Sequence, residues 1–206
     1  IIITGAAGNL GSVVTEKMLA EGRQVFATVG PHESEDFLQH ERLKAEKLDL
    51  LNAEVTQSFV EKVIDEQEDP LEGAVLLAGG FSMGSIADTG SENLDKMYRL
   101  NFKTAYHVVQ PLLKHWREEE SGGTLVFIGA KPALEPSAGK NLAAYALSKS
   151  LLFELASYIN AGAGEHGIKA AVIAPSIIDT PPNREAMPDA DPSDWVPPQR
   201  IADTIS

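Results

Sequence analysis

The sequence predicts an α/β domain in which helices cover both faces of a doubly wound parallel sheet. Three observations point to this class. Short runs that are apolar on both faces alternate with longer stretches of helical periodicity, which is typical of parallel strands buried between helices. The first apolar run passes through a glycine-spaced turn directly into a helix. The 206 residues, 43% of them hydrophobic, suit one domain with a substantial core and are few for two.

The glycine-spaced turn comes first in chain order, in IIITGAAGNLG at residues 1–11, and leads into a predicted helix over 12–20. Gly5 lets the chain turn sharply out of the strand, Gly8 lets backbone approach a diphosphate, and Gly11 lets the helix pack close to the sheet. The amino end of that helix offers unpaired N–H groups and the positive end of its dipole to a phosphate. The turn therefore predicts a dinucleotide site, although glycines so spaced also occur in ordinary turns.

The rest of the chain continues the alternation. Residues 181–198 break it, with six of the 12 prolines beside Met187 and Trp195. Because prolines disfavour helices and sheet ladders while the two apolar side chains can cover a flat ring, we expect a mobile substrate lid that orders on ligand binding. Ligands of such sheets bind at the carboxyl ends of the strands. Further strands are predicted at 24–29, within 45–50, and at 73–78, 123–128 and 167–174, and further helices at 53–67, 91–116, 143–161 and 198–205.

Composition excludes several function classes. Asp and Glu number 30 against 17 Lys and Arg, a formal charge of -13 that disfavours nucleic acid and anionic membranes as partners. No apolar run is long enough to span a bilayer and no signal peptide is visible, so a cytoplasmic protein is expected. The chain has no Cys and its five His residues show no ligand spacing, so neither thiol chemistry nor a metal site is predicted. The sequence starts without Met inside a predicted strand, which leaves open whether its ends are complete.

A second constellation is YALSK at residues 145–149. On a helix, Tyr145 and Lys149 are one turn apart on the same face, so the ammonium is expected to lie under the phenol. A tyrosine ordinarily ionises near pH ~10, and a neighbouring cation stabilises the phenolate and so brings the group closer to useful acid/base chemistry. The pair therefore predicts a proton donor and its activator. By spacing alone, a surface Tyr/Lys pair is the commoner case.

In their order and spacing the motifs resemble those of the short-chain dehydrogenase/reductase family over essentially the whole chain. The matching motifs are TGAAGNLG at 4–11, DL at 49–50, AGG at 78–80, Asn101, YALSK at 145–149 and PSIIDT at 175–180. The resemblance implies a Rossmann-type fold, NAD(P)(H) as cofactor and hydride transfer, with Tyr145, Lys149 and Asn101 as catalytic residues. The cofactor-binding residues that it implies are Gly5, Ala7, Gly8, Asn9, Leu10, Gly11, Asp49, Leu50, Ala78, Gly79, Gly80, Tyr145, Lys149, Pro175, Ile178 and Thr180.

The resemblance also assigns roles within this set. Asp49 would meet the adenine amine, Lys149 the nicotinamide ribose, and Pro175 and Thr180 the nicotinamide end, while Asn101 would hold a water for proton relay. Without the resemblance, Asp49 is an ordinary turn residue and Asn101 an ordinary buried polar side chain.

Two stretches are closer to dihydropteridine reductase than to the average family member. They are IGAKPAL at 128–134 and, more distinctively, DTPPNREAMPDADPSDW at 179–195, with AGG at 78–80 in support. Most family members carry a serine after the fifth strand, whereas this chain has Ala130 there. Dihydropteridine reductases also lack this serine. Its loss is compatible with reduction of a quinonoid pterin, whose activated C=N system needs less help from a hydroxyl donor.

Two strand ends depart from the family pattern. The fourth strand ends in LLAG at 76–79, where two asparagines that brace the sheet are usual, so apolar packing is expected to replace them. The second strand ends in TVGPH at 28–32, with neither the acid that selects NAD nor an arginine. The sequence therefore predicts weak discrimination between the two cofactors, with a slight preference for NADP(H).

The predicted function is NAD(P)(H)-dependent reduction of a small carbonyl or imine by one Rossmann-type domain over residues 1–206. Two alternatives stay open: a dinucleotide-binding sensor or regulatory protein without turnover, and a non-redox lyase or epimerase on the same fold. The long helix and the helix that carries YALSK commonly form a four-helix interface in the family that the chain resembles. A homodimer or homotetramer is therefore expected.

Overall fold

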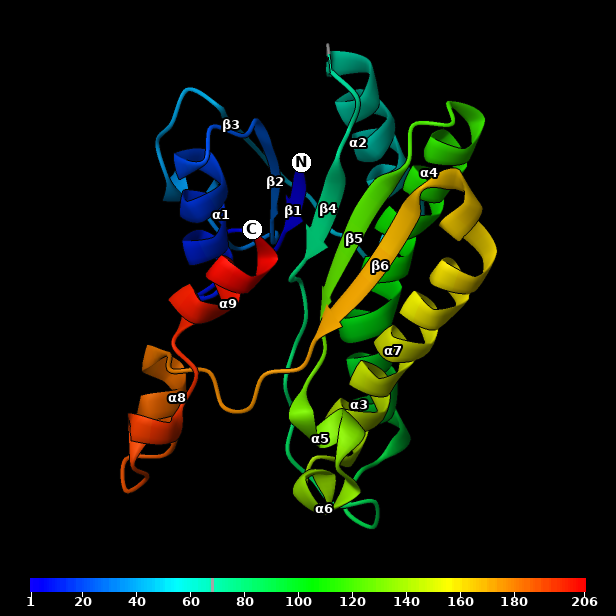
Figure 1. Ribbon diagram of the computed structural model, residues 1–206. Helices are drawn as coiled ribbons and strands as arrows, with labels where there is room; N and C mark the ends of the chain where they lie inside the picture. The colour runs from blue at the N-terminus through cyan, green and yellow to red at the C-terminus, as the bar shows by residue number, and fades with distance from the viewer. Residues whose placement is uncertain (68) are drawn as a thin grey trace.

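The computed structural model describes residues 1–67 and 69–206 and confirms the predicted fold class (Figure 1). Within these residues six parallel strands form one sheet in the order β3-β2-β1-β4-β5-β6. Since β1 and β4 are neighbours and the chain winds outward from them in both directions, the crevice between their carboxyl ends is the topological switch point at which such sheets bind ligands. The strands are β1 (Ile2–Thr4), β2 (Val25–Val29), β3 (Leu43–Lys47), β4 (Gly73–Leu76), β5 (Gly123–Ile128) and β6 (Ile168–Ile173).

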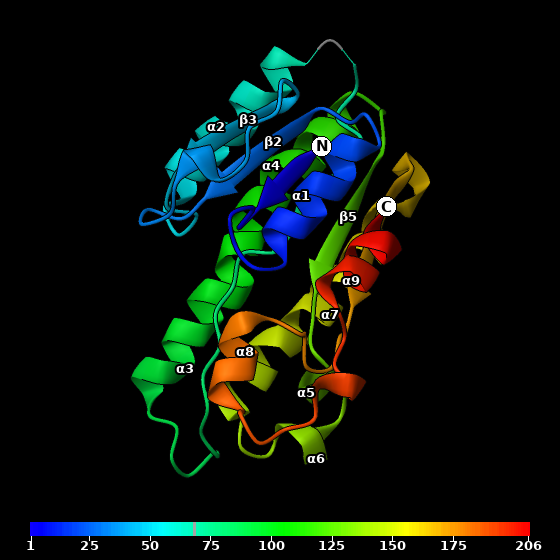
Figure 2. The same cartoon turned by 90° about the vertical axis from the view of Figure 1, so that its left-hand side faces the viewer.

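Helices cover both faces of the sheet. One face carries α1 (Gly11–Ala20) and α9 (Pro198–Ile205), which lie side by side (Figure 2). The other carries α2 (Ala53–Glu66), α4 (Thr104–Glu118) and α7 (Ala143–Ala163). Each face has its own apolar core cluster. All five residues of β2 are buried, as expected for a strand that has helices on both sides.

The observed elements confirm most of the predicted ones. The strand predicted at 123–128 and the helix predicted at 198–205 have the same bounds in the structure. The third strand was predicted too late in the chain. It was expected within 45–50, whereas β3 begins at Leu43 and ends at Lys47. Its alternating Lys and Glu residues form a half-exposed edge strand, whereas Leu48 and Leu50, which suggested the strand, are core residues of the following turn.

The helical predictions need two corrections. The helix expected over 91–116 is interrupted, because α3 (Ser91–Tyr98) passes through a π-helical turn at Arg99–Lys103 before α4 begins. The prolines of the segment 181–198 do not prevent a helix, since α8 (Pro181–Ala186) starts on two of them. Proline is tolerated in the first helical turn, where its missing N–H would have no partner within the helix.

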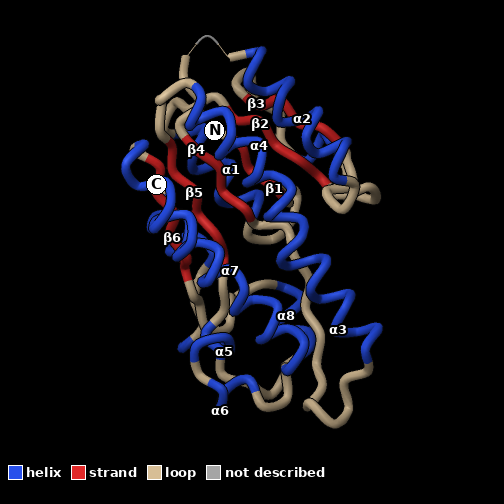
Figure 3. Tube along the Cα trace, turned by 90° about the vertical axis from the view of Figure 1, so that its right-hand side faces the viewer, coloured by secondary structure: helices blue, strands red, loops and turns tan. Residues whose placement is uncertain are grey.

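The short helices gather at one end of the molecule. Beyond the carboxyl ends of the strands lie α5 (Lys131–Leu134) and α6 (Pro136–Gly139), which follow β5, and α8, which follows β6 (Figure 3). The switch point therefore opens toward the connections that vary most freely in such folds.

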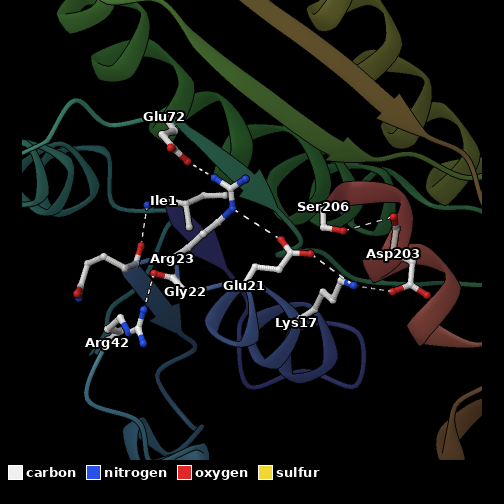
Figure 4. Close-up of polar contacts among 10 residues, drawn as sticks. Ile1, Lys17, Glu21, Gly22, Arg23, Arg42, Glu72, Asp203 and Ser206 are labelled. Carbon is white, nitrogen blue, oxygen red and sulfur yellow. Dashed lines mark hydrogen bonds and ion pairs between the residues drawn. The ribbon is translucent and has the colours of Figure 1, made fainter.

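One ion pair joins α9 to α1 at the opposite end of the sheet, and further pairs lie beside it (Figure 4). Lys17 of α1 contacts Glu21 at 3.4 Å and Asp203 of α9 at 3.2 Å. Arg23 pairs with Glu72, which directly precedes β4. Exposed pairs of this kind each contribute only about 0–1 kcal/mol to stability. Their position matters more here, because these cations lie at the amino-terminal ends of the strands, away from the switch point.

Two kinds of feature are missing from the part of the chain that the structure describes. None of its helices combines the length and the apolarity needed to cross a membrane. No three of its His, Asp or Glu side chains come together closely enough to hold a metal ion.

Candidate active site

The crevice between β1 and β4 is braced by Thr4, the buried last residue of β1. Its hydroxyl oxygen accepts hydrogen bonds from the backbone N–H groups of Leu77 (3.1 Å) and Ala78 (3.2 Å), just past the end of β4. The prediction that apolar packing alone replaces the usual asparagines is therefore wrong. A hydroxyl on the neighbouring strand satisfies these N–H groups instead, as buried backbone donors require.

The glycine-spaced turn has the geometry that a diphosphate cradle needs. Gly5 has a φ of 64°, and a Cβ on it would lie 3.0 Å from the Cα of Ala78. A Cβ on Gly11 would lie 2.0 Å from the carbonyl oxygen of Gly5, so α1 packs against the turn without room for a side chain. A Cβ on Gly8 would meet only that same oxygen, at 3.3 Å, and would otherwise project into open space. No side chain of the described residues caps the start of α1, and its first turn carries no acid.

Substitutions of Gly8 and Gly11 should therefore have different effects, the first on cofactor binding and the second on stability. We expect Gly8→Ala to leave the melting temperature nearly unchanged but to weaken NADH binding more than about 10-fold, because the methyl group fills the space next to the turn. Gly11→Ala should instead lower stability by about 3 kcal/mol or more, because the clash is with backbone. Thermal melts and cofactor titrations of the two variants check both statements. Equal loss of stability in both would contradict the assignment of Gly8 to binding.

Lys149 lies between the ends of β4 and β5. Its buried Nζ donates a hydrogen bond to the carbonyl oxygen of Ile128, the last residue of β5, at 2.7 Å. A Cβ on Gly79 would lie 3.4 Å from the same Nζ. Burial lowers the pKa of Lys149 to about 8. The ammonium is thus held in the switch region by a backbone carbonyl.

Tyr145 differs from its prediction in one respect. It is partly buried one turn before Lys149 on α7, as expected, but burial raises the pKa of its phenol above the usual value. The predicted lowering by the ammonium is therefore wrong for the protein without a ligand. The physical reason is that desolvation dominates the environment of the phenol, while the hydrogen bond of Lys149 is directed to Ile128.

Asn101 is fully engaged by protein groups. Its Oδ1 accepts from the N–H of Gly80 at 2.8 Å, and its Nδ2 donates to the hydroxyl of Ser148 at 2.9 Å and contacts the sulfur of Met97 at 3.8 Å. Ser148 in turn donates to the carbonyl oxygen of Tyr145 at 2.8 Å. The amide therefore braces the segment after β4 against α7. The water-holding role of Asn101 stays a prediction, and these side-chain contacts do not test it.

An aromatic ring packs against Tyr145. The ring of Phe81 meets it edge to face, with centroids 5.1 Å apart, and Phe81 is 62% exposed. Ala130 is buried directly after β5 and supplies no hydroxyl. Ser137, a hydroxyl side chain in the loop before Tyr145, is exposed on α6. Phe81 thus offers an aromatic surface next to the phenol.

The remaining predicted residues lie along the same edge of the sheet. Asp49 is exposed, and its Oδ1 accepts from the N–H of Leu51 at 2.9 Å, so it closes a turn after β3. Leu50 is buried in the core. After β6, the carbonyl oxygen of Pro175 accepts from the N–H of Lys131 at 2.9 Å, which ties this connection to the start of α5.

The predicted lid is anchored at both ends. Ile178 forms a parallel bridge with Val196, in which the N–H of Asp179 donates to the carbonyl oxygen of Val196 at 2.8 Å. Arg184 of α8 donates two hydrogen bonds to the carboxylate of Asp179, at 2.6 and 2.8 Å. Thr180 is buried at the start of α8. The segment is therefore a closed loop with its own internal contacts.

Comparison with known proteins agrees with this geometry. The family model described as short chain dehydrogenase matches residues 1–191. The chain belongs to the short-chain dehydrogenase family. Dihydropteridine reductase of Dictyostelium discoideum is 30% identical over 160 residues, which cover 74% of this chain and 64% of that protein. Membership of the family confirms the resemblance on which the predicted site was built.

Two further relatives of this short-chain dehydrogenase set the limits of the comparison. The uncharacterized oxidoreductase YuxG of Bacillus subtilis is 30% identical over 195 residues, which cover 86% of this chain but only 26% of that protein. The chain thus spans about a quarter of the length of that relative. The solved structure of ElxO with NADP bound has a TM-score of 0.89 at 20% identity and covers 99% of this chain and 88% of that one. Its likeness shows the fold.

Four residues of the short-chain dehydrogenase site were missed by the sequence reasoning. Ser148 stands inside YALSK, and its place directly before the buried Lys149 could have signalled its contact with Asn101. Thr4, the polar end of an apolar strand, was a comparable signal. Phe81 and Glu33 gave none, because their contacts depend on how the loops after β4 and β2 fold back.

Proposed function

We propose that this short-chain dehydrogenase is an NAD(P)(H)-dependent oxidoreductase that reduces a small carbonyl or imine, with Tyr145 as the proton donor. One observation carries the proposal. The glycine turn after β1, the ammonium of Lys149 beside β5, and Tyr145 all converge on the carboxyl end of the sheet. The open space next to Gly8 and the uncapped start of α1 suit a diphosphate.

The division of labour follows from this placement. Reduced nicotinamide, when bound, supplies the hydride. As a substrate carbon accepts it, Tyr145 gives its phenolic proton to the attached oxygen or nitrogen, so that the substrate gains one hydride and one proton. Lys149, with a pKa of about 8, stays charged at neutral pH and offsets the charge that develops on the phenolate. The phenol then regains its proton from solvent.

The proposed substrate is a small planar compound of the quinonoid pterin type. Phe81 provides an exposed aromatic ring beside Tyr145, on which a flat ring can stack. Ala130 provides no second hydroxyl donor, which suits an activated C=N bond better than a simple ketone. The similarity to the dihydropteridine reductase of Dictyostelium discoideum supports the same substrate class.

The experiment is a screen in which the purified chain oxidises NADH or NADPH in the presence of quinonoid pterins, ketones or aldehydes. We expect turnover with a quinonoid pterin. Saturable cofactor binding without oxidation by any of the compounds would favour the sensor alternative. Product formation without net change of the nicotinamide would favour a lyase or epimerase. Either result overturns the proposal.

Closure of segment 181–198 over the substrate remains part of the proposal. The bridge between Ile178 and Val196 fixes the two ends of the segment, so we expect α8 to move with its loop about these two points rather than to fold from a disordered state. Met187 and Trp195 supply the apolar side chains for contact with a flat ring.

We also propose a homodimer that forms through α3 and α4. Tyr98, Phe102 and Tyr106 stack along these helices with ring centroids 5.5 and 5.9 Å apart, and Tyr98 and Tyr106 are 38% and 45% exposed. An aromatic stripe of this kind favours burial against a partner. Light scattering is expected to give at least twice the chain mass of 22.1 kDa, and Tyr106→Glu is expected to give the single mass. A parent protein that stays monomeric at about 50 μM would contradict the proposal.

A further inference from the structure

The turn that follows β2 closes on itself through Glu33. The N–H of Glu33 donates to the carbonyl oxygen of Gly30 at 3.0 Å, and the N–H of Gly30 donates back to Oε2 of Glu33 at 2.6 Å. The carboxylate of a residue four positions beyond the strand is thereby brought back to the strand end. Glu33 is partly buried there.

The carboxylate occupies the space that a side chain at position 30 would take. A Cβ on Gly30 would lie 3.2 Å from Oε2 of Glu33 and 3.6 Å from its Cδ. The strand end lies directly beside the glycine turn, because the N–H of Ala6 donates to the carbonyl oxygen of Thr28 at 3.0 Å. Glu33 therefore places a negative charge at the end of β2 next to the turn proposed to hold the diphosphate.

Among the described residues, no lysine or arginine forms an ion pair with this carboxylate. The sequence has no Lys or Arg between Arg23 and Arg42, and within the described chain none of the ion pairs involves Glu33. Arg42 donates to the carbonyl oxygen of Gly22 at 2.8 Å and Arg23 pairs with Glu72, so both face the amino-terminal end of the sheet (Figure 4). A phosphate at the end of β2 would therefore meet an acid and no Lys or Arg side chain from this segment.

We infer that Glu33 sets the cofactor preference of this protein, in favour of NAD(H). An acid at the end of the second strand accepts hydrogen bonds from the ribose hydroxyls of NAD and repels the 2′-phosphate of NADP. The inference rests on the proposed function, because it needs a dinucleotide on the glycine turn. The slight preference for NADP(H) was expected because residues 28–32 contain no acid. Glu33 lies just outside that stretch, and its hydrogen bond to the N–H of Gly30 brings a carboxylate to the end of β2.

Two substitutions separate the charge of Glu33 from its hydrogen bond. Glu33→Gln keeps an oxygen that can accept from the N–H of Gly30 and removes the charge. Glu35→Gln is the matched control, because Glu35 also accepts from a backbone N–H, that of Lys47 at 2.8 Å, on the same loop. If Glu33 only closed the turn, Glu33→Gln would keep this hydrogen bond and leave the choice of ligand as it was.

The test titrates the full-length chain and both variants with NADH and NADPH by fluorescence, and with ADP-ribose and its 2′-phosphate by calorimetry. The parent is expected to bind each ligand without the 2′-phosphate at least about 10-fold more tightly. Glu33→Gln should reduce this ratio to about threefold or less, mainly by tighter binding of the phosphorylated ligands, and Glu35→Gln should preserve it.

Four outcomes would overturn the inference. Parent protein that binds both cofactors equally, or a Glu33→Gln ratio equal to that of the parent, would do so while leaving the proposed function intact. An equal change of the ratio in Glu35→Gln would show that overall charge and not Glu33 is responsible. If none of the ligands binds to the parent, both the inference and the proposed function are wrong.

Discussion

Replacing Tyr145 with Phe is expected to lower turnover with the best substrate by ~10²-fold or more while cofactor affinity stays within about twofold. The change removes one oxygen with its proton and keeps the ring, so the edge contact with Phe81 at 5.1 Å can persist. Ala130 cannot take over, because it has no hydroxyl. The loss should therefore appear in kcat and not in the dissociation constant of the cofactor.

Tyr158→Phe is the matched control for this substitution. Tyr158 lies on the same helix, α7, but is 76% exposed. Initial rates of NADH or NADPH oxidation and fluorescence titrations of both variants give the comparison. A Tyr145→Phe protein that turns over at the parental rate would remove the central residue of the mechanism and leave only a dinucleotide-binding fold.

The sequence was sufficient for the fold because periodicity and glycine spacing are local signals. The run at 123–128 is short and mostly apolar, and its alternation with longer helical stretches is typical of a strand in a parallel sheet covered by helices. The glycine turn was equally readable. Gly5 needs a positive φ and Gly11 has backbone 2.0 Å from the site of a Cβ, so each position tolerates little else.

The details of the site were less predictable because they depend on contacts across loops. Helical spacing put Tyr145 and Lys149 on one face, but only the packing of α7 against β5 shows that the ammonium bonds to Ile128. Likewise, Glu33 reaches the end of β2 through a turn that no motif in the sequence announces. The π-helical turn at Arg99–Lys103 contains no proline or glycine and does not interrupt the helical pattern of apolar residues, so nothing in the sequence indicated it.

The buried ammonium of Lys149 should destabilise the protein without ligand. Burial lowers its pKa from 10.5 to about 8, a shift equivalent to about 3 kcal/mol. Below pH 8 the lysine is charged in both the folded and the unfolded state, so the full cost of burying the ammonium lowers the stability of the fold. Between pH 8 and 10.5 the unfolded chain binds more protons than the folded one, so this group makes the free energy of unfolding rise with pH. A residue that we propose for the chemistry is thus expected to lower stability at neutral pH.

Lys149→Met is accordingly expected to raise stability at pH 7 while turnover falls below detection. The change removes the buried charge and keeps the length of the side chain, at the loss of about 1 kcal/mol for the bond to Ile128. A net gain of about 2 kcal/mol corresponds to a melting temperature higher by roughly 4–8 °C in a chain of this size. At pH 9.5 the charge contribution should shrink to about half, because the folded lysine is then largely neutral. Thermal melts at both pH values, with the exposed Lys140→Met as control, measure this. A Lys149→Met protein that melts below the parent at pH 7 would show that hydrogen bonding, and not the desolvated charge, dominates at this position.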